Sequence, residues 1–170
     1  MIGSRKIEDL HPIVADLCRK WLAECANQKI DVIITSTYRD AEYQNSLYAE
    51  GRTSPGKIIT NARAGQSFHN YRMAFDFVPV VDRKPAWSDM ALIEKCGVIG
   101  ENVGLQWAGR WNGRLRESLH LQFSGGLMLS ELQSGKTLPK PEQVKSHDTD
   151  SNLEVENDVG GCAHVSSGTR

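Results

Sequence analysis

The sequence lacks any apolar run approaching the roughly 20 residues that a membrane-spanning helix needs. Its first residues, MIGSRKIEDLHP, lack the apolar stretch of a secretory signal. We therefore expect a protein that is made in the cytoplasm and has no stable membrane association. The four cysteines include no Cys-x-x-Cys pair, which argues against a thiol metal site and favours reduced cysteines in a core.

A large net charge is also missing. The chain carries −1 overall, and its segment 146–170 carries −4, so that residues 1–145 carry +3. This imbalance is too weak to indicate a nucleic-acid partner, and we expect none. The length of 170 residues suits one domain. Beyond residue 135 the composition turns to Pro, Ser, Asp, Asn and Gly, which predicts a tail rather than core: we expect one domain at 1–135 and a disordered acidic tail at 136–170. We also expect a monomer, although no residue pattern indicates the oligomeric state.

Four segments have the features of helices. Apolar residues recur at helical spacing over 10–25, with Asp9 as the predicted N-cap. Asp40 is the predicted cap of a second helix at 41–50, which Gly51 ends. A third helix is expected from a cap at Ser88 to about Val103, and a short one at 127–132.

Three segments have the features of strands: 31–38, 74–80 and 118–123. In the last of these, apolar residues alternate with His120 and Gln122, which therefore share a face. The connection at 52–66 is long and rich in Gly, Ser, Asn and Pro, and loops of this length in compact domains are often functional. A second connection, at 105–117, contains two tryptophans.

Polar residues of metal-ligand type stand beside two of these strands. His69 precedes one strand, Asp76 lies within it, and His120 lies on the polar face of another. Zinc accepts imidazole nitrogen and carboxylate oxygen as ligands, and the three side chains can converge if the two strands pair. The alternative is that each is a hydrogen-bonded structural residue at the edge of the core.

The stretch SFHNYRMAFDFVP, followed by ESLHLQF, resembles the signature of zinc peptidases of the D-alanyl-D-alanine carboxypeptidase type. Within that group, the sequence is most similar to phage endolysins that are L-alanyl-D-glutamate peptidases, over about 4–123. The resemblance implies an α+β domain with helices packed on a small, mostly antiparallel sheet. It also implies zinc ligands at His69, Asp76 and His120, with Glu117 as the catalytic acid/base and Ser67 bracing the site.

The same resemblance implies cleavage of the L-Ala–D-Glu bond in the stem peptide of bacterial peptidoglycan. Such endolysins wait in the host cytoplasm until the inner membrane is permeabilised. Two alternatives stay open: a D-alanyl-D-alanine carboxypeptidase or dipeptidase, and a zinc-bearing protein that binds without catalysis.

Three further residues are candidates for contact with substrate or for its support, the first two by the resemblance. Arg39 is the expected partner of the substrate carbonyl oxygen, with a surface ion pair to Asp40 or Glu42 as its alternative. Gln44 is expected to support substrate binding, although the helical pattern places it on the outer surface. Trp107 is expected to contribute to an aromatic wall for substrate, together with Trp111, and a place in the core is the alternative for both.

One position departs from the family signature. Arg72 stands where the signature has Gly, and if that turn needs a positive φ, a side chain there costs on the order of 1 kcal/mol. We also expect that Arg72 could extend into the cleft and change the substrate that fits it.

Overall fold

The computed structural model describes residues 1–113 and 116–140. The described part of the chain contains four α-helices, three 3-10 helices and five strands, which confirms the expected α+β class. The helices are α1 (Pro12–Asn27), α2 (Ala41–Ala49), α3 (Met90–Asn102) and α4 (Leu129–Gln133). The 3-10 helices are η1 (Ile7–Asp9), η2 (Phe68–Tyr71) and η3 (Ala108–Arg110).

The strands form one antiparallel sheet. They are β1 (Asp31–Ser36), β2 (Ala74–Val81), β3 (Lys84–Pro85), β4 (Gln106–Trp107) and β5 (His120–Gln122). The order is β1-β2-β5-β4, with β3 added to the end of β2. Two short strands were not indicated by the sequence pattern: β3, just after the predicted strand 74–80, and β4, inside a segment we expected to be a loop.

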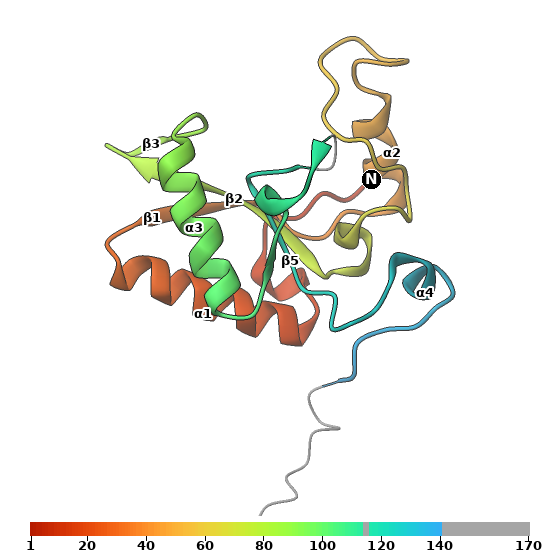
Figure 1. Ribbon diagram of the computed structural model, residues 1–170. Helices are drawn as coiled ribbons and strands as arrows, with labels where there is room; N and C mark the ends of the chain where they lie inside the picture. The colour runs from red at the N-terminus through yellow and green to blue at the C-terminus, as the bar shows by residue number, and fades with distance from the viewer. Residues whose placement is uncertain (114–115, 141–170) are drawn as a thin grey trace, which may run out of the picture.

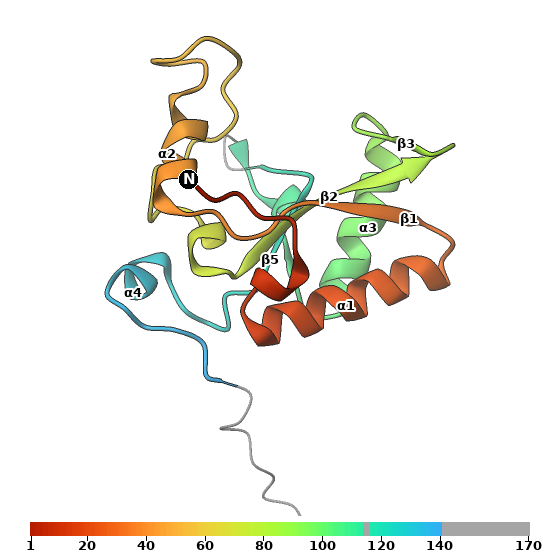
Figure 2. The ribbon, with the colours of Figure 1, turned by 180° about the vertical axis from the view of Figure 1, so that it is seen from behind.

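The core lies between the sheet and the helices α1 and α3, which pack against each other and against the strands (Figures 1 and 2). Trp21 of α1 is fully buried between Phe75 and Phe77 of β2, with ring centroids 5.4 and 5.0 Å apart, and its indole N–H donates to the Cys96 carbonyl at 2.9 Å. Burying such rings supplies a large part of the folding free energy. The aromatic part of the hydrophobic core therefore lies at the α1–α3 end of the molecule.

The opposite end of the molecule carries α2, η2 and the connection 52–66, which lie beside the beginning of β2 (Figure 1). Asp40 caps α2 as expected, because its carboxylate accepts from the Tyr43 N–H at 2.7 Å. No helix in the described ranges, 1–113 and 116–140, is both long and apolar enough to cross a membrane.

Three predicted helix starts were too early: by two residues in the first helix, by one in the third, and by two in the short last helix, which begins at Leu129. The first long helix begins at Pro12 after His11, whereas Asp9 lies in η1 and its carboxylate accepts from the Ser4 hydroxyl at 2.5 Å. The third begins at Met90 with Asp89 as its cap, since that carboxylate accepts from the Leu92 N–H at 3.0 Å. The Asp9 carboxylate is thus occupied by the Ser4 hydroxyl, and Asp89 rather than Ser88 accepts from the first turn of the third helix. Sequence spacing alone does not distinguish between such neighbouring capping residues.

The core includes a residue beyond the predicted domain boundary at residue 135. Leu138 is only 5% exposed and belongs to the core, and a Cβ added at Gly125 would lie 2.3 Å from its Cδ2 atom. The rest of the predicted tail, 141–170, lies outside the described residues. Cys18, Cys25 and Cys96 are free and buried, as expected for core cysteines, and Cys162 also lies outside the described residues.

Candidate metal centre

The sheet register brings two of the expected ligands together. Asp76 on β2 lies directly opposite His120 on β5, and Ser36 at the end of β1 lies on the other side of Asp76. His69 comes from η2, which is capped by Ser67: the Ser67 hydroxyl accepts from the His69 N–H at 3.4 Å. The chain leaves η2 through Arg72 in the left-handed conformation, with φ +63°, and enters β2 two residues later.

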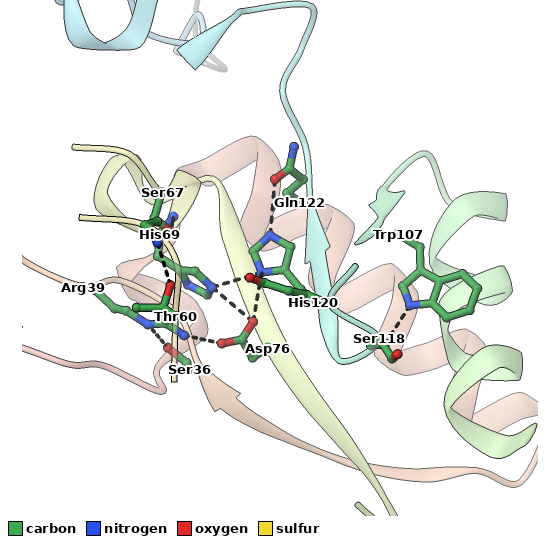
Figure 3. A network of polar contacts seen from close by, with 12 residues as sticks. Ser36, Arg39, Thr60, Ser67, His69, Asp76, Trp107, Ser118, His120 and Gln122 are labelled. Atoms are coloured by element: carbon green, nitrogen blue, oxygen red, sulfur yellow. Dashed lines mark hydrogen bonds and ion pairs between the residues drawn. The ribbon is translucent and has the colours of Figure 1, made fainter. Parts of the chain in front are cut away.

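The three side chains form a compact cluster (Figure 3). The His69 Nε2 atom lies 3.1 Å from Asp76 Oδ1 and 3.2 Å from His120 Nδ1, and His120 Nδ1 lies 3.0 Å from Asp76 Oδ1. Within residues 1–113 and 116–140 this is the only group of three or more acidic, histidine or cysteine side chains that meet in this way. The expectation that the three converge is therefore confirmed.

The imidazole atoms outside the cluster are hydrogen-bonded to acceptors. His69 Nδ1 lies 2.5 Å from the Thr37 carbonyl oxygen, and His120 Nε2 lies 3.3 Å from the Gln122 side-chain oxygen. A carbonyl oxygen only accepts, so each of these nitrogens donates, and a neutral ring then keeps its lone pair on the nitrogen inside the cluster. Orienting partners of this kind are typical of histidines that bind metal.

The cluster fits a divalent metal in size and in chemistry. A tetrahedral ion with bonds of about 2.05 Å to nitrogen and oxygen has ligand atoms about 3.3 Å apart. The three separations of 3.0–3.2 Å are close to this value. Two imidazole nitrogens and one carboxylate oxygen are also a common donor set for a catalytic metal with one open position.

The charges in the cluster favour a cation. Desolvation lowers the pKa of the fully buried His69 imidazole and keeps this ring neutral. Burial alone would raise the pKa of the Asp76 carboxyl, but His69 and His120 outweigh it and hold that pKa well below its usual range. For His120, desolvation is outweighed by the hydrogen bond and charge of Asp76, which raise the pKa of its imidazole. The carboxylate therefore stays ionised at the centre of the cluster.

Arg39 holds the other oxygen of the same carboxylate. Its guanidinium donates to Asp76 Oδ2, and its Nε donates to the Ser36 hydroxyl at 2.9 Å. This pairing replaces the surface ion pair with Asp40 or Glu42 that was the alternative for Arg39. Its backbone is tied to η2, because the Arg39 N–H donates to the His69 carbonyl at 3.3 Å and the Asn70 amide donates to the Arg39 carbonyl at 2.9 Å.

Glu117 stands beside the cluster without joining it. Its Oε2 atom lies 3.8 Å from His120 Nδ1, its side chain is about half exposed, and its N–H donates to the Ala108 carbonyl at 3.2 Å. It comes directly before the turn into β5, as expected from the sequence. A carboxylate at this distance reaches a water molecule at the open position, as an acid/base requires.

A pocket of about 270 Å³ opens over the cluster. Its floor includes Arg39, His69 and His120, together with Glu117 and Ser67. The connection 52–66 and the segments near Trp111 and Leu129 form its walls. The long connection singled out in the sequence therefore contributes to the site.

A second hollow, of about 400 Å³, meets the first at Glu117 and His120. Its outer wall is apolar, with Ile59, Trp87 and Met90 all about half exposed. The cluster thus lies between two openings of different character, one with many polar groups and one with exposed apolar side chains.

The two tryptophans of the second connection have different places. Trp107 is 4% exposed and its indole N–H donates to the Ser118 carbonyl at 2.8 Å, away from the cluster (Figure 3). This position does not fit the expected contact with substrate, because the ring packs against Gly97 and Gly109, where an added Cβ would lie 2.2 Å from it. Trp111 lines the pocket, with its ring centroid 6.0 Å from that of His120.

Two other expectations need correction. Gln44 is fully buried rather than on the helix surface, and its amide donates to the Ala62 carbonyl at 2.8 Å. It therefore holds a pocket wall instead of contacting a substrate directly. Arg72 does have the positive φ that its turn requires, but its side chain does not reach the cleft. Its guanidinium lies 4.0 Å from the centre of the Tyr38 ring and donates to the Asp9 carbonyl at 2.7 Å.

Sequence reasoning missed the groups that orient the histidines. The Thr37 carbonyl belongs to the backbone and leaves no signal in the residue type. Gln122 had a signal, since it shares the polar face of its strand with His120. Gln106, which accepts from the Gln122 amide at 3.0 Å, becomes its neighbour only through the pairing of β4 with β5.

Comparison with known proteins identifies the class of enzyme to which this fold and metal-type cluster belong, a metallopeptidase, and the chain belongs to the D-alanyl-D-alanine carboxypeptidase family. The model of the family described as D-alanyl-D-alanine carboxypeptidase matches residues 60–123. The chain is 36% identical over 127 residues to the peptidoglycan L-alanyl-D-glutamate endopeptidase CwlK of Bacillus subtilis (strain 168), a match that covers 68% of this chain and 74% of CwlK.

The fold is shared with a solved structure, the L-Ala D-Glu endopeptidase ChiX of Serratia marcescens. The TM-score is 0.54 at 16% identity, and the match covers 74% of this chain and 86% of ChiX.

Proposed function

We propose that the protein is a zinc-dependent peptidoglycan endopeptidase that cleaves the L-Ala–D-Glu bond of the stem peptide. The support for the bond is the likeness to CwlK, which is an L-alanyl-D-glutamate endopeptidase. The support for the chemistry is the cluster of His69, Asp76 and His120 with Glu117 beside it.

Zinc is the metal that this donor set favours. Two imidazole nitrogens suit a borderline-soft ion, whereas magnesium and calcium prefer sites built entirely of oxygen ligands. A metal bound there supplies Lewis acidity, which polarises a carbonyl group and makes water acidic near neutral pH.

The chain's own residues supply the remaining steps. Glu117 takes a proton from the attacking water and then gives it to the amine that leaves. Arg39 donates to the carbonyl oxygen as negative charge develops on it, since Asp76 and Ser36 accept from two of the five N–H groups of its guanidinium. The walls exclude bulk water and align the peptide over the cluster.

The observation that carries the endopeptidase mode is the pair of hollows that meet at Glu117 and His120. An enzyme that cuts within a chain must hold substrate on both sides of the scissile bond. A carboxypeptidase needs room for only one terminal residue on the leaving side. Two openings of about 270 and 400 Å³ suit the first task better than the second.

Digestion of purified peptidoglycan, followed by mass spectrometry, tests the proposal. We expect stem peptides with new D-Glu amino termini from the wild type and none from Glu117→Gln, which keeps the metal ligands. Wall fragments with intact L-Ala–D-Glu bonds would contradict the proposal. Release of free D-alanine instead would favour the carboxypeptidase or dipeptidase, and equal wall binding by both proteins without turnover would favour a binding role.

We propose in addition that the enzyme acts as an endolysin, waiting in the host cytoplasm until the inner membrane is permeabilised. The support is the resemblance of its motifs to phage endolysins. Expression in Escherichia coli tests this: lysis should begin only after a membrane-permeabilising agent is added. Lysis without that agent, or none with it, would contradict this mode of use.

A further inference from the structure

A chain of hydrogen-bonded side-chain amides runs from the cluster of His69, Asp76 and His120 to the protein surface. His120 Nε2 faces the Gln122 oxygen at 3.3 Å, the Gln122 amide nitrogen donates to the Gln106 oxygen at 3.0 Å, and the Gln106 amide nitrogen donates to the Ser124 hydroxyl at 3.2 Å. Gln122 is 6% exposed, whereas Gln106 is exposed on β4. The register between β4 and β5 sets the two glutamines directly opposite each other.

The direction of this chain matters because an amide has an acceptor end and a donor end. With its oxygen toward His120, Gln122 requires a proton on Nε2, so that Nδ1 keeps its lone pair for the cluster. If the amide turned over, its NH2 group would require the lone pair on Nε2. The proton of the neutral ring would then lie on Nδ1, the atom that must bind metal.

Gln106 selects between these two directions. Its oxygen accepts from the Gln122 nitrogen and so keeps the Gln122 oxygen toward His120. Ser124 does not make the choice, because a hydroxyl both donates and accepts. If both amides turned over, the same side chains would still be hydrogen-bonded. The direction of the Gln122 amide therefore depends on which end of the residue at position 106 faces it.

We infer that Gln106 is a positioning residue, which through Gln122 keeps His120 in the tautomer that binds metal. Gln106 touches no ligand of the cluster, yet it sets the affinity of the site for its metal. The inference rests on the proposed function only in requiring that the cluster binds a metal, and it holds for any divalent metal and any peptide bond.

Two substitutions at position 106 give opposite outcomes. Gln106→Glu presents acceptors only and keeps the direction of the chain, whereas Gln106→Lys presents donors only and reverses it. Both changes are at an exposed position, so the fold of the metal-free protein should be unaffected. Zinc affinity, measured by competition with a chromophoric chelator, should stay within about twofold for Gln106→Glu and fall about 10–100-fold for Gln106→Lys.

High salt and a second substitution distinguish the proposed effect on the amide direction from simple repulsion between the introduced lysine and the metal. Repulsion across solvent is screened at about 1 M salt, where the Debye length is about 3 Å, but the direction of the amide is unaffected. The loss in Gln106→Lys should therefore persist there. Adding Gln122→Glu should restore the affinity, because a carboxylate accepts from His120 Nε2 in any orientation.

Nuclear magnetic resonance provides a second readout. In the zinc-loaded wild type, the His120 Nε2–H proton should give a protected signal, which Gln106→Lys should lose. Zinc affinity unchanged by Gln106→Lys, equal losses in Gln106→Lys and Gln106→Glu, or recovery of Gln106→Lys in salt would overturn the inference alone. A wild-type protein that binds no metal would overturn the proposed function as well.

Discussion

The floor and the walls of the site are built in different ways. Each floor residue comes from the sheet or a segment tied to it, and each has fixed partners: Asp76 is opposite His120, and Arg39 holds the second oxygen of Asp76. The walls come from connections between elements, such as 52–66 and the segment around Trp111. Strand register therefore positions the reactive groups of this protein, whereas the loops determine which substrates the cleft admits.

The largest effect, a loss of zinc affinity, should follow from removing a metal ligand from the floor of the site. His120→Ala removes one of the three ligands, and we expect zinc affinity to fall on the order of 10³-fold or more, equal to about 4 kcal/mol. Metal analysis after dialysis and release of D-Glu termini from peptidoglycan measure the two consequences. Trp111→Ala is the matched control from the wall and should keep its zinc. Equal zinc content in both variants would contradict the division between floor and walls.

The next largest effect concerns Trp107, which supports the floor from behind. Trp107→Ala leaves a cavity under β5 and removes the hydrogen bond to the Ser118 carbonyl, so we expect a loss of about 3–5 kcal/mol in the free energy of unfolding. Urea denaturation of the metal-free protein measures it. A Trp107→Ala variant that unfolds like the wild type but has a raised KM would support the original expectation of a substrate contact.

A smaller and different effect is expected from the wall tryptophan. Trp111 lies at the pocket surface near the ring of His120, so Trp111→Ala should lower kcat/KM about tenfold, or about 1.4 kcal/mol. The free energy of unfolding should change by less than about 1 kcal/mol. Peptidoglycan fragments of defined sequence serve as substrates. If Trp111→Ala instead destabilised the protein as strongly as Trp107→Ala, both rings would belong to the core.

The smallest effect is expected at the turn before the floor. Arg72→Gly removes the strain of a side chain at φ +63°, worth about 1 kcal/mol, but it also loses the contacts with Tyr38 and the Asp9 carbonyl. We expect the two terms to cancel to within about 1 kcal/mol in thermal unfolding, with kcat/KM unchanged. An altered preference among peptide substrates would show that Arg72 reaches the cleft after all.

The parts of the site that could be predicted from the sequence are those fixed by residue type at short spacing. His69, Asp76 and His120 were predicted because the stretches that carry them resemble a known signature, whereas their spacing alone left hydrogen-bonded structural residues as the alternative. Arg39 was predicted, but its partner Asp76 was not, since the ion pair depends on how β1 ends beside β2.

The parts that could not be predicted depend on long-range packing. Trp107 and Trp111 are four residues apart and equally apolar, yet one lies against the glycines of α3 and η3 and the other lines the pocket. Gln44 is polar in a helix of mixed composition, and its burial depends on a connection that folds over it. Short elements such as β4 carry too few residues for any periodicity.

The packing of Leu138 against Gly125 decides where this enzyme can be joined to another module. A fusion that cuts the chain at residue 135 would remove this buried leucine and expose apolar surface that favours aggregation. A junction placed after residue 140 keeps this leucine packed in the core.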